Sequence, residues 1–257
     1  MFFKEYIKTA QTAMRGQTNG GIIYMFPNIL VNLLYLFPLM FLWRVIAGGG
    51  MDVGMSLSQL LTYTYVNALL SEMFVVRTSA SSWNYEGQLI SLFARPFPVF
   101  GQLIAQTVGG WIPMFLIFSM PMFLVAPLFG ISVIPATLWF FPSLLLCISL
   151  GFAIDFIFAC VTIRLRGMAW LGYSIRMAIV SLFSGTVIPF RVLPFGLTTI
   201  FEYQPFGSLG GAPLSLLVGT TDPAQIIITQ IAWNIILWPV AILWFGKSKE
   251  RQVSYGG

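Results

Sequence analysis

The chain has no histidine, two cysteines and few charged residues, and each shortage removes a class of function. Without histidine there is no His-ligated metal site, no Ser–His or Cys–His nucleophile pair and no histidine proton relay. Cys147 and Cys160 are too few for a disulfide framework, and both fall inside one apolar stretch, where buried thiols act as small hydrophobes. A Gly-rich dinucleotide fingerprint and a Gly-x-Ser-x-Gly motif are also missing. The sequence therefore gives no support to an enzyme.

The shortage of charge excludes a soluble domain. Charged residues make up 8% of the 257 residues and hydrophobic ones 58%, which leaves too little polar surface to cover a soluble domain of this size. The formal net charge is +5, but the basic residues are scattered at the ends of apolar runs and do not interleave with aromatic residues on one face. This pattern argues against nucleic-acid binding.

One stretch resembles a nucleotide-binding loop without meeting its requirements. Ala241–Ser248 matches Gly-x-x-x-x-Gly-Lys-Ser except that Ala241 stands where the first glycine belongs. The motif also needs a preceding strand and a following helix, whereas Gly246 ends an apolar run and Lys247 begins a basic tail. We expect no cofactor on this chain, and any nucleotide energy would come from another polypeptide.

Long apolar stretches fill most of the chain. A hydrocarbon core of about 30 Å needs ~20 helical residues, and free backbone groups cannot be satisfied by water there. The sequence predicts an all-α integral membrane protein, a single transmembrane domain over residues 1–257. The six predicted spans cover 21–47, 57–78, 102–129, 134–163, 168–189 and 224–246.

The distribution of Lys and Arg predicts the orientation, because short loops rich in these residues stay in the cytoplasm. With six spans and both termini inside, the outer segments hold little beyond Arg191. The cytoplasmic segments then hold Lys4, Lys8, Arg15, Arg77, Arg95, Arg164, Arg166, Lys247, Lys249 and Arg251. We therefore expect a multi-pass protein whose N- and C-termini are both cytoplasmic.

Three connecting segments differ from plain linkers. Residues 1–20 carry apolar residues at helical spacing and predict an interfacial helix, which either only anchors the chain or also couples to other parts. Residues 79–100 carry Leu89, Leu92 and Phe93 at helical spacing before Pro96, which predicts a short amphipathic helix for a partner or for the membrane surface. Residues 190–223 are apolar but broken by prolines, and they predict short interfacial or re-entrant helices at the outer surface.

Two charges lie deep inside apolar stretches. Asp155 and Arg176 stand at similar distances from the short turn at Leu165 and Arg166, so an antiparallel helix pair would bring them face to face. An unpaired charge at the bilayer centre costs ~2.5–3.5 kcal/mol on insertion scales, and pairing offsets part of it. We predict an ion pair that locks this hairpin; contact with a substrate or a proton is the alternative.

Polar residues also occur on the first two spans. Asn32, Tyr63, Asn67 and Ser71 either pack between helices or line a path for an amphipathic substrate. Packing is the commoner use of such residues, and the apolar composition identifies no cargo.

The layout resembles a known family. An amphipathic N-terminal helix, six spans, Glu86-Gly87 followed by Leu92 and Arg95-Pro96, and Gly185, Pro189, Pro194 and Pro205 before the sixth span are similar to the membrane subunits of type-two ATP-binding-cassette (ABC-2) exporters. The resemblance covers essentially the whole chain. It is to the small permeases that lack a fused nucleotide-binding domain.

The resemblance implies partners and roles. Two permease subunits, identical or paralogous, would form the pathway in the lipid of a bacterial cytoplasmic (inner) membrane, and a separate dimeric ATPase would bind ATP and Mg²⁺ on the cytoplasmic face. A coupling helix that seats in the ATPase would include Glu86, Gly87, Leu89, Leu92, Arg95 and Pro96. The first, second and fifth spans would form the dimer interface. Gly185, Pro189, Pro194 and Pro205 would belong to an outer gate.

Two other classes stay open. A secondary transporter would normally carry several intramembrane acidic residues and inverted repeats, whereas Asp155 is nearly alone. A non-catalytic membrane partner, such as an accessory or immunity protein, needs no motif at all. Co-purification with an ATPase would separate the exporter subunit from both.

Overall fold

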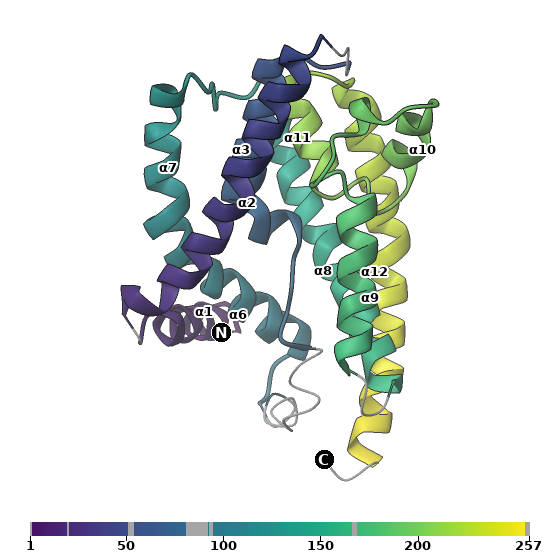
Figure 1. Cartoon of the computed structure of the whole chain (residues 1–257). Coiled ribbons are helices and arrows are strands. Elements are labelled where there is room, and N and C mark those ends of the chain that lie inside the picture. The colour runs from purple at the N-terminus through teal and green to yellow at the C-terminus, as the bar shows by residue number, and fades with distance from the viewer. Residues whose placement is uncertain are drawn as a thin grey trace.

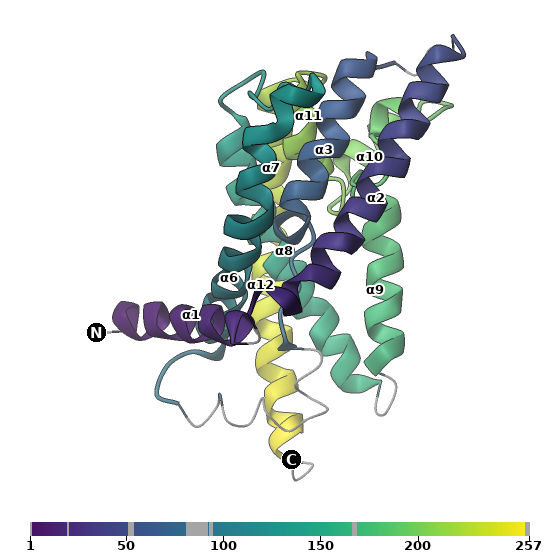
Figure 2. The ribbon, with the colours of Figure 1, turned by 60° about the vertical axis from the view of Figure 1, so that its left-hand side comes forward.

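The computed structural model describes residues 2–19, 21–50, 54–80, 92, 95–165 and 169–254, and within these ranges all regular structure is helical (Figure 1). Four helical stretches are long and apolar enough to cross a membrane: Met25–Gly48, Val99–Phe129, Phe140–Thr162 and Pro223–Ser248. Most helices run roughly parallel to one another, and α1 lies across them at one end of the bundle (Figure 2). The all-helical, membrane-compatible fold predicted from the apolar stretches is thus present.

The N-terminal helix α1 (Phe2–Thr18) packs along α6 (Val99–Met114). Two glycines of α6 permit this approach, because a Cβ on Gly109 would lie 2.2 Å from the Ala10 carbonyl oxygen and one on Gly101 would lie 2.6 Å from the Tyr6 ring. The predicted amphipathic face of α1 is therefore divided. Tyr6 and Ala10 face α6, while Ile7 remains 44% exposed.

Helix α2 (Ile22–Gly48) contacts α3 (Leu57–Phe74) mainly through its second half. Leu36, Met40 and Trp43 are buried there, and the Trp43 indole N–H donates to Thr64 Oγ1 at 2.9 Å. The first half of α2 stays largely exposed and diverges from α3 toward α1 (Figure 1).

The second of these long stretches, Val99–Phe129, which corresponds to the third predicted span, is not a uniform helix. It consists of α6, a π-helical turn η1 (Phe115–Ser119), α7 (Met120–Val125) and a 3₁₀ turn η2 (Ala126–Phe129). Pro113, Pro121 and Pro127 recur along it, and each removes a backbone donor, so the regular i→i−4 ladder cannot continue. The stretch begins at Val99, slightly before the predicted span.

Helices α8 (Phe140–Arg164) and α12 (Pro223–Ser254) pack along each other, and α8 is the more buried of the two. Phe156 of α8 is completely buried against Phe245 of α12 and Phe100 of α6. Helix α8 begins at Phe140, whereas the predicted span began at residue 134, because Pro135 interrupts the apolar run before the helix starts.

The second and fifth predicted spans are shorter as helices than their apolar runs. The helix of the second, α3, ends at Phe74 rather than residue 78, and the chain continues in extended form. Helix α9 (Ala169–Phe183) ends before residue 189, because Gly185 takes a left-handed φ of 74° and Pro189 follows. At 1.5 Å per residue, α3 measures about 27 Å and α9 about 22 Å.

The segment before α12 holds the 3₁₀ turn η3 (Phe190–Val192) and the short helices α10 (Leu197–Tyr203) and α11 (Gly211–Val218). Helix α10 is peripheral, with Ile200 66% exposed. Every residue of α11 is buried, and the helix packs on α8 and α3. The predicted surface position is therefore wrong for α11, because its residues are buried against α8 and α3, and the re-entrant alternative stays a prediction.

Candidate functional site

The two intramembrane charges meet in the interior of the bundle. Arg176 Nη1 of α9 lies 2.7 Å from Asp155 Oδ1 of α8, and their side chains are 6% and 1% exposed. The hairpin register argued from the sequence places both residues as the structure has them. Within the described residues, Arg176 Nε has no hydrogen-bond partner, so the guanidinium is held at its two terminal nitrogens.

A third segment joins this pair. The extended residues after α3 enter the groove between α8 and α9, where the backbone N–H of Thr78 donates to Asp155 Oδ2 at 2.9 Å. The Thr78 hydroxyl donates to the same carboxylate, and Arg176 Nη2 donates to the Val76 carbonyl oxygen. The ion pair thus does more than lock a hairpin, because it also binds the backbone of residues 76–78.

The physical reason is the extended backbone itself. Inside a membrane, non-helical backbone is tolerated only where protein groups satisfy its N–H and C=O groups. Asp155 accepts from the N–H of Thr78, and Arg176 donates to the C=O of Val76. Val76 also packs so closely on α8 that a Cβ on Gly151 would lie 2.6 Å from its methyl group. We name Asp155, Arg176, Val76 and Thr78 the buried junction.

A more exposed ion pair lies beside the junction. Arg77 Nη2 donates to Glu72 Oε1 at 2.8 Å, and Arg77 Nη1 donates to the Tyr173 hydroxyl of α9 at 3.3 Å. The two charged side chains are 39% and 43% exposed. Water screens such a pair, so its contribution to stability is small.

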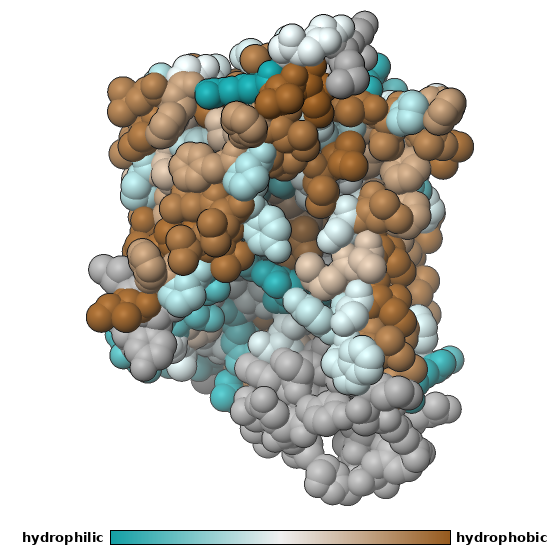
Figure 3. All heavy atoms as spheres, viewed as in Figure 1, coloured by the Kyte–Doolittle hydropathy of each residue, from teal (hydrophilic) through white to brown (hydrophobic). Residues whose placement is uncertain are grey.

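A large polar cleft opens next to this exposed pair. Its volume is about 1340 Å³, and its walls come from α1, the first half of α2, α6 and the end of α3. Asn32 and Ser71, two of the polar residues singled out in the sequence, line it. Hydrophilic side chains gather below the middle of the view in Figure 3, beneath a broad apolar band. We call this feature the polar cleft.

The other two singled-out residues, Tyr63 and Asn67, lie elsewhere. The Tyr63 hydroxyl donates to the Gly185 carbonyl oxygen at 2.7 Å, and the Asn67 amide donates to that of Thr186 at 2.8 Å. Tyr63 is 2% exposed. These two side chains therefore hold the chain where α9 ends, which agrees with the packing interpretation, and Tyr63 does not line an open path.

The residues assigned to an outer gate divide into a buried and a peripheral group. Gly185 and Pro189 are buried, and Gly185 faces Gly211 so closely that an added Cβ would lie 3.0 Å from its Cα. Pro194 is exposed in the turn before α10, and Pro205 is half-buried after α10. Close glycine packing, rather than the prolines as a set, brings this region together.

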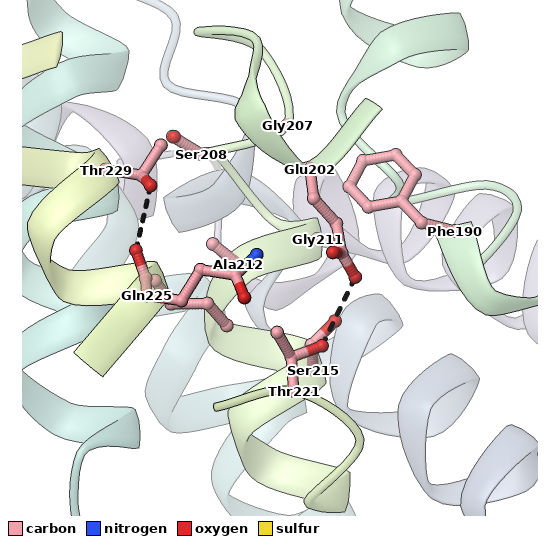
Figure 4. Close-up of a pocket in the computed structure, with 11 residues that line it drawn as sticks. Phe190, Glu202, Gly207, Ser208, Gly211, Ala212, Ser215, Thr221, Gln225 and Thr229 are labelled. Carbon is pink, nitrogen blue, oxygen red and sulfur yellow. Dashed lines mark hydrogen bonds between the residues drawn. The ribbon is translucent and has the colours of Figure 1, made fainter. Parts of the chain in front are cut away.

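A small pocket lies between α10, α11 and the start of α12 (Figure 4). Its volume is about 10 Å³, which is room for at most one water molecule. Glu202 points toward Thr221, whose hydroxyl donates to it at 3.3 Å, and Arg191 Nε lies 3.9 Å from the same carboxylate. This pocket is a packing defect between short helices and not a ligand site.

Three of the six residues assigned to a coupling helix, Leu92, Arg95 and Pro96, lie within the part of the chain that the structure describes. Glu86, Gly87 and Leu89 lie outside the described residues. Leu92 is 2% exposed in the core beside Leu103 and Trp111, and Gln102 Nε2 donates to its carbonyl oxygen at 3.0 Å. A buried Leu92 offers no surface to a partner, so its assignment to docking is corrected to an anchoring role. Arg95 and Pro96 are exposed, and Arg95 lines the polar cleft.

Sequence reasoning missed Thr78 and Val76 in the junction. Their partners are 77 and 100 residues away, and no local spacing signals such a contact. The sequence offered one signal. Two further apolar residues, Val75 and Val76, follow Phe74, and the small polar residues Thr78 and Ser79 come shortly after them. No family model matches the chain, and no curated protein matches it. The functional conclusion therefore depends on geometry and on the layout of the sequence.

Proposed function

We propose that the chain is a permease subunit of an ATP-driven exporter of the type-two ABC class. It would cross a bacterial cytoplasmic membrane six times with both termini inside, pair with an identical or paralogous permease, and bind separate ATPase subunits. What supports six crossings is that α3 and α9, although short, lie alongside the long helices, and that α1 and the end of α12 lie at the same end of the bundle (Figure 1).

One observation carries the proposal. The segment that leads out of α3 toward the proposed ATPase contact is attached to α8 and α9 through the buried junction. A displacement of the segment 79–100 by closing ATPases would therefore act directly on two membrane helices. Energetic coupling of this kind requires such a physical connection between the driven surface and the pathway.

A secondary transporter is the second candidate, because a buried charge beside extended backbone is also typical of ion-coupled carriers. The geometry of the junction favours this candidate less. Asp155 Oδ1 is engaged by Arg176, and Asp155 Oδ2 accepts two hydrogen bonds from Thr78. Three partners already occupy a carboxylate that has about four lone-pair sites, so little coordination capacity is left for a coupling ion.

Purification of the tagged chain from its native host in mild detergent tests the proposal. We expect a soluble ATPase in equal amount to total permease, and a second six-span protein alongside if the pathway is heterodimeric. Recovery of the chain without an ATPase, repeated in lipid nanodiscs to exclude loss in detergent, would overturn the exporter assignment.

Two substitutions then test where the ATPase binds. We expect Glu86→Ala and Arg95→Ala to reduce ATPase activity coupled to transport while the chain still inserts into the membrane. Lys247→Ala is the matched control, because Lys247 is an exposed basic residue of α12 outside the proposed contact segment. Unchanged activity in both test variants would remove the docking assignment.

A further inference from the structure

The polar cleft is large and is lined by charged side chains, and helix packing alone explains neither property. We propose that it binds the zwitterionic headgroup of a phospholipid-like amphiphile drawn from the adjacent leaflet. The cleft is separate from the buried junction and from the pocket of Figure 4. Its volume of about 1340 Å³ exceeds the ~300–1,000 Å³ of ordinary small-molecule sites, so a headgroup and the first part of its chains fit inside.

The charges of the walls select the kind of headgroup. Among the described residues that line the cleft, Lys8, Arg77 and Arg95 are basic and Glu5 and Glu72 are acidic. Three positive groups against two negative ones leave about one positive charge in excess. A multiply anionic headgroup would meet two carboxylates, whereas a phosphate with an attached ammonium finds a partner for each charge.

The existing ion pairs can exchange their partners. Lys8 lies 3.1 Å from Glu5, and both side chains are about half exposed. Arg77 and Glu72 are exposed to a similar extent. Pairs in this setting contribute little to stability, so replacing one partner by a ligand phosphate or ammonium costs little.

One buried acceptor in the cleft also lacks a donor. Gln106 of α6 lines the cleft, and its Oε1 is inaccessible to solvent with no hydrogen-bond partner within the described structure. A buried unpaired acceptor is unfavourable, and rotation of the Gln106 side chain toward the cleft would let a bound ammonium or hydroxyl group donate to it. The amides of Asn28 and Asn32 on the facing wall add further hydrogen-bonding groups.

The apolar part of the cleft shows where the chains would go. Met25 and Val31 of α2 and Trp111 of α6 line it, and Val31 is 48% exposed. Phe26 and Leu30 on the neighbouring face of α2 are 59% and 43% exposed. Acyl chains leaving the cleft would therefore lie along apolar side chains that already face lipid, which points to a membrane molecule as the source.

Native mass spectrometry of the purified full chain tests the proposal, with phosphatidylethanolamine, phosphatidylglycerol and diacylglycerol added separately. We expect phosphatidylethanolamine to bind at least about fivefold more tightly than the other two, because only it supplies both charges. Equal binding of all three lipids would overturn the proposal. Binding of soluble glycerophosphoethanolamine as tight as that of the lipid would overturn the membrane source.

Matched variants locate the site. Lys8→Gln and Lys4→Gln change the same residue type one turn apart on α1, both at exposed positions, and only Lys8 lines the cleft. We expect Lys8→Gln to weaken phosphatidylethanolamine binding about fivefold, the size of one solvent-exposed ion pair, and Lys4→Gln to leave it unchanged. Equal effects of the two variants would show general surface attraction and overturn the site. The ligand site and the ATPase assignment can fail separately, because this assay contains no ATPase.

Discussion

At the scale of single residues, Asp155 has two partners, Arg176 and Thr78, and they decide how much stability is lost when its charge is removed. Asp155→Asn keeps an oxygen that can accept from the Thr78 N–H, but it leaves Arg176 as a buried charge without a counter-ion. Because breaking one side of a buried pair costs ~3–5 kcal/mol, we expect a loss of that order in the free energy of unfolding. Thermal unfolding of the purified protein in detergent measures it.

The double variant and an exposed pair provide the controls. Asp155→Asn combined with Arg176→Gln removes both charges while Gln can still donate to Val76, so we expect it to recover much of the lost stability. Arg77→Gln breaks the half-exposed pair with Glu72 and should cost no more than ~1 kcal/mol. Additive losses in the double variant would contradict the pairing account.

A second residue-scale prediction concerns Gly185. Its φ is 74°, and a Cβ there would lie 2.8 Å from the Phe190 ring. Gly130 has a similar φ of 71° but has nothing within 4 Å of an added Cβ. Gly130→Ala should therefore cost about 1 kcal/mol for the backbone alone, and Gly185→Ala ~1–3 kcal/mol more for the overpacking.

The same unfolding assay compares the two glycine variants. Equal costs would show that the contact between Gly185 and Phe190 is not tight in the folded protein. A larger loss in Gly185→Ala than in Gly130→Ala would show that the end of α9 depends on close packing and not only on backbone freedom.

The limit of sequence reasoning at this scale is visible in the buried junction. Asp155 and Arg176 could be paired in advance, because a short turn fixes the register of an antiparallel helix pair. The contact of Thr78 could not be predicted in the same way, because it depends on where an extended segment crosses that helix pair. No local spacing of residues in the sequence indicates how three separate segments pack.

At the scale of helices, the contact between α1 and α6 makes a sharp prediction. Gly109→Ala would place a Cβ 2.2 Å from the Ala10 carbonyl oxygen, so α1 must shift away from α6. The adjacent Gly110→Ala has only a Gln17 side-chain atom nearby, at 3.9 Å. We expect hydrogen–deuterium exchange in α1 to rise in the first variant and to stay at the wild-type level in the second.

The two alanine variants share their helix and their intrinsic propensity, so the comparison isolates the contact. Equal exchange in α1 for both would contradict the packing of α1 on α6 and would favour a helix held only by lipid. That outcome would also remove one wall of the polar cleft.

Helix existence was easier to predict than helix length. Apolar runs gave the positions of the long helices, since burial in lipid or protein demands an apolar surface in either case. The same runs overestimated α3 and α9, because residues 75–78 and 184–189 belong to the predicted spans but are not helical. Hydropathy measures where a chain prefers to lie, not which backbone conformation it takes there.

Helix α11 illustrates the same limit. Its apolar sequence is compatible with a lipid-facing surface and with a protein core, and only the contacts with α8 and α3 decide for the core. Gly210 and Gly211 permit this burial, because a Cβ on either would collide with Thr186 or Phe190.

At the scale of the whole molecule, six crossings with both ends inside can be tested by chemical labelling. Cys147 and Cys160 are buried and free, so both are replaced by alanine before single cysteines are introduced at Lys4, Thr199 and Lys247. We expect a membrane-impermeant maleimide to label Thr199→Cys in intact cells and the other two only after permeabilisation.

Labelling of all three positions from one side would contradict the six-crossing topology. It would show that α12, which is the one proposed span between Thr199 and Lys247, does not carry the chain across, and that at least one of the five earlier spans fails as well. The control is retention of the protein in the membrane fraction for each variant, since the three positions are exposed and should not affect folding.

The buried junction also constrains how the protein is made. During synthesis α8 leaves the ribosome before α9, so the carboxylate of Asp155 reaches the translocation channel before Arg176 does. Holding one charge in hydrocarbon costs ~2.5–3.5 kcal/mol, which entry of the two helices together avoids. We therefore expect α8 and α9 to leave the translocation channel for the lipid together. The ion pair of Asp155 and Arg176 would thus set when these two helices enter the membrane.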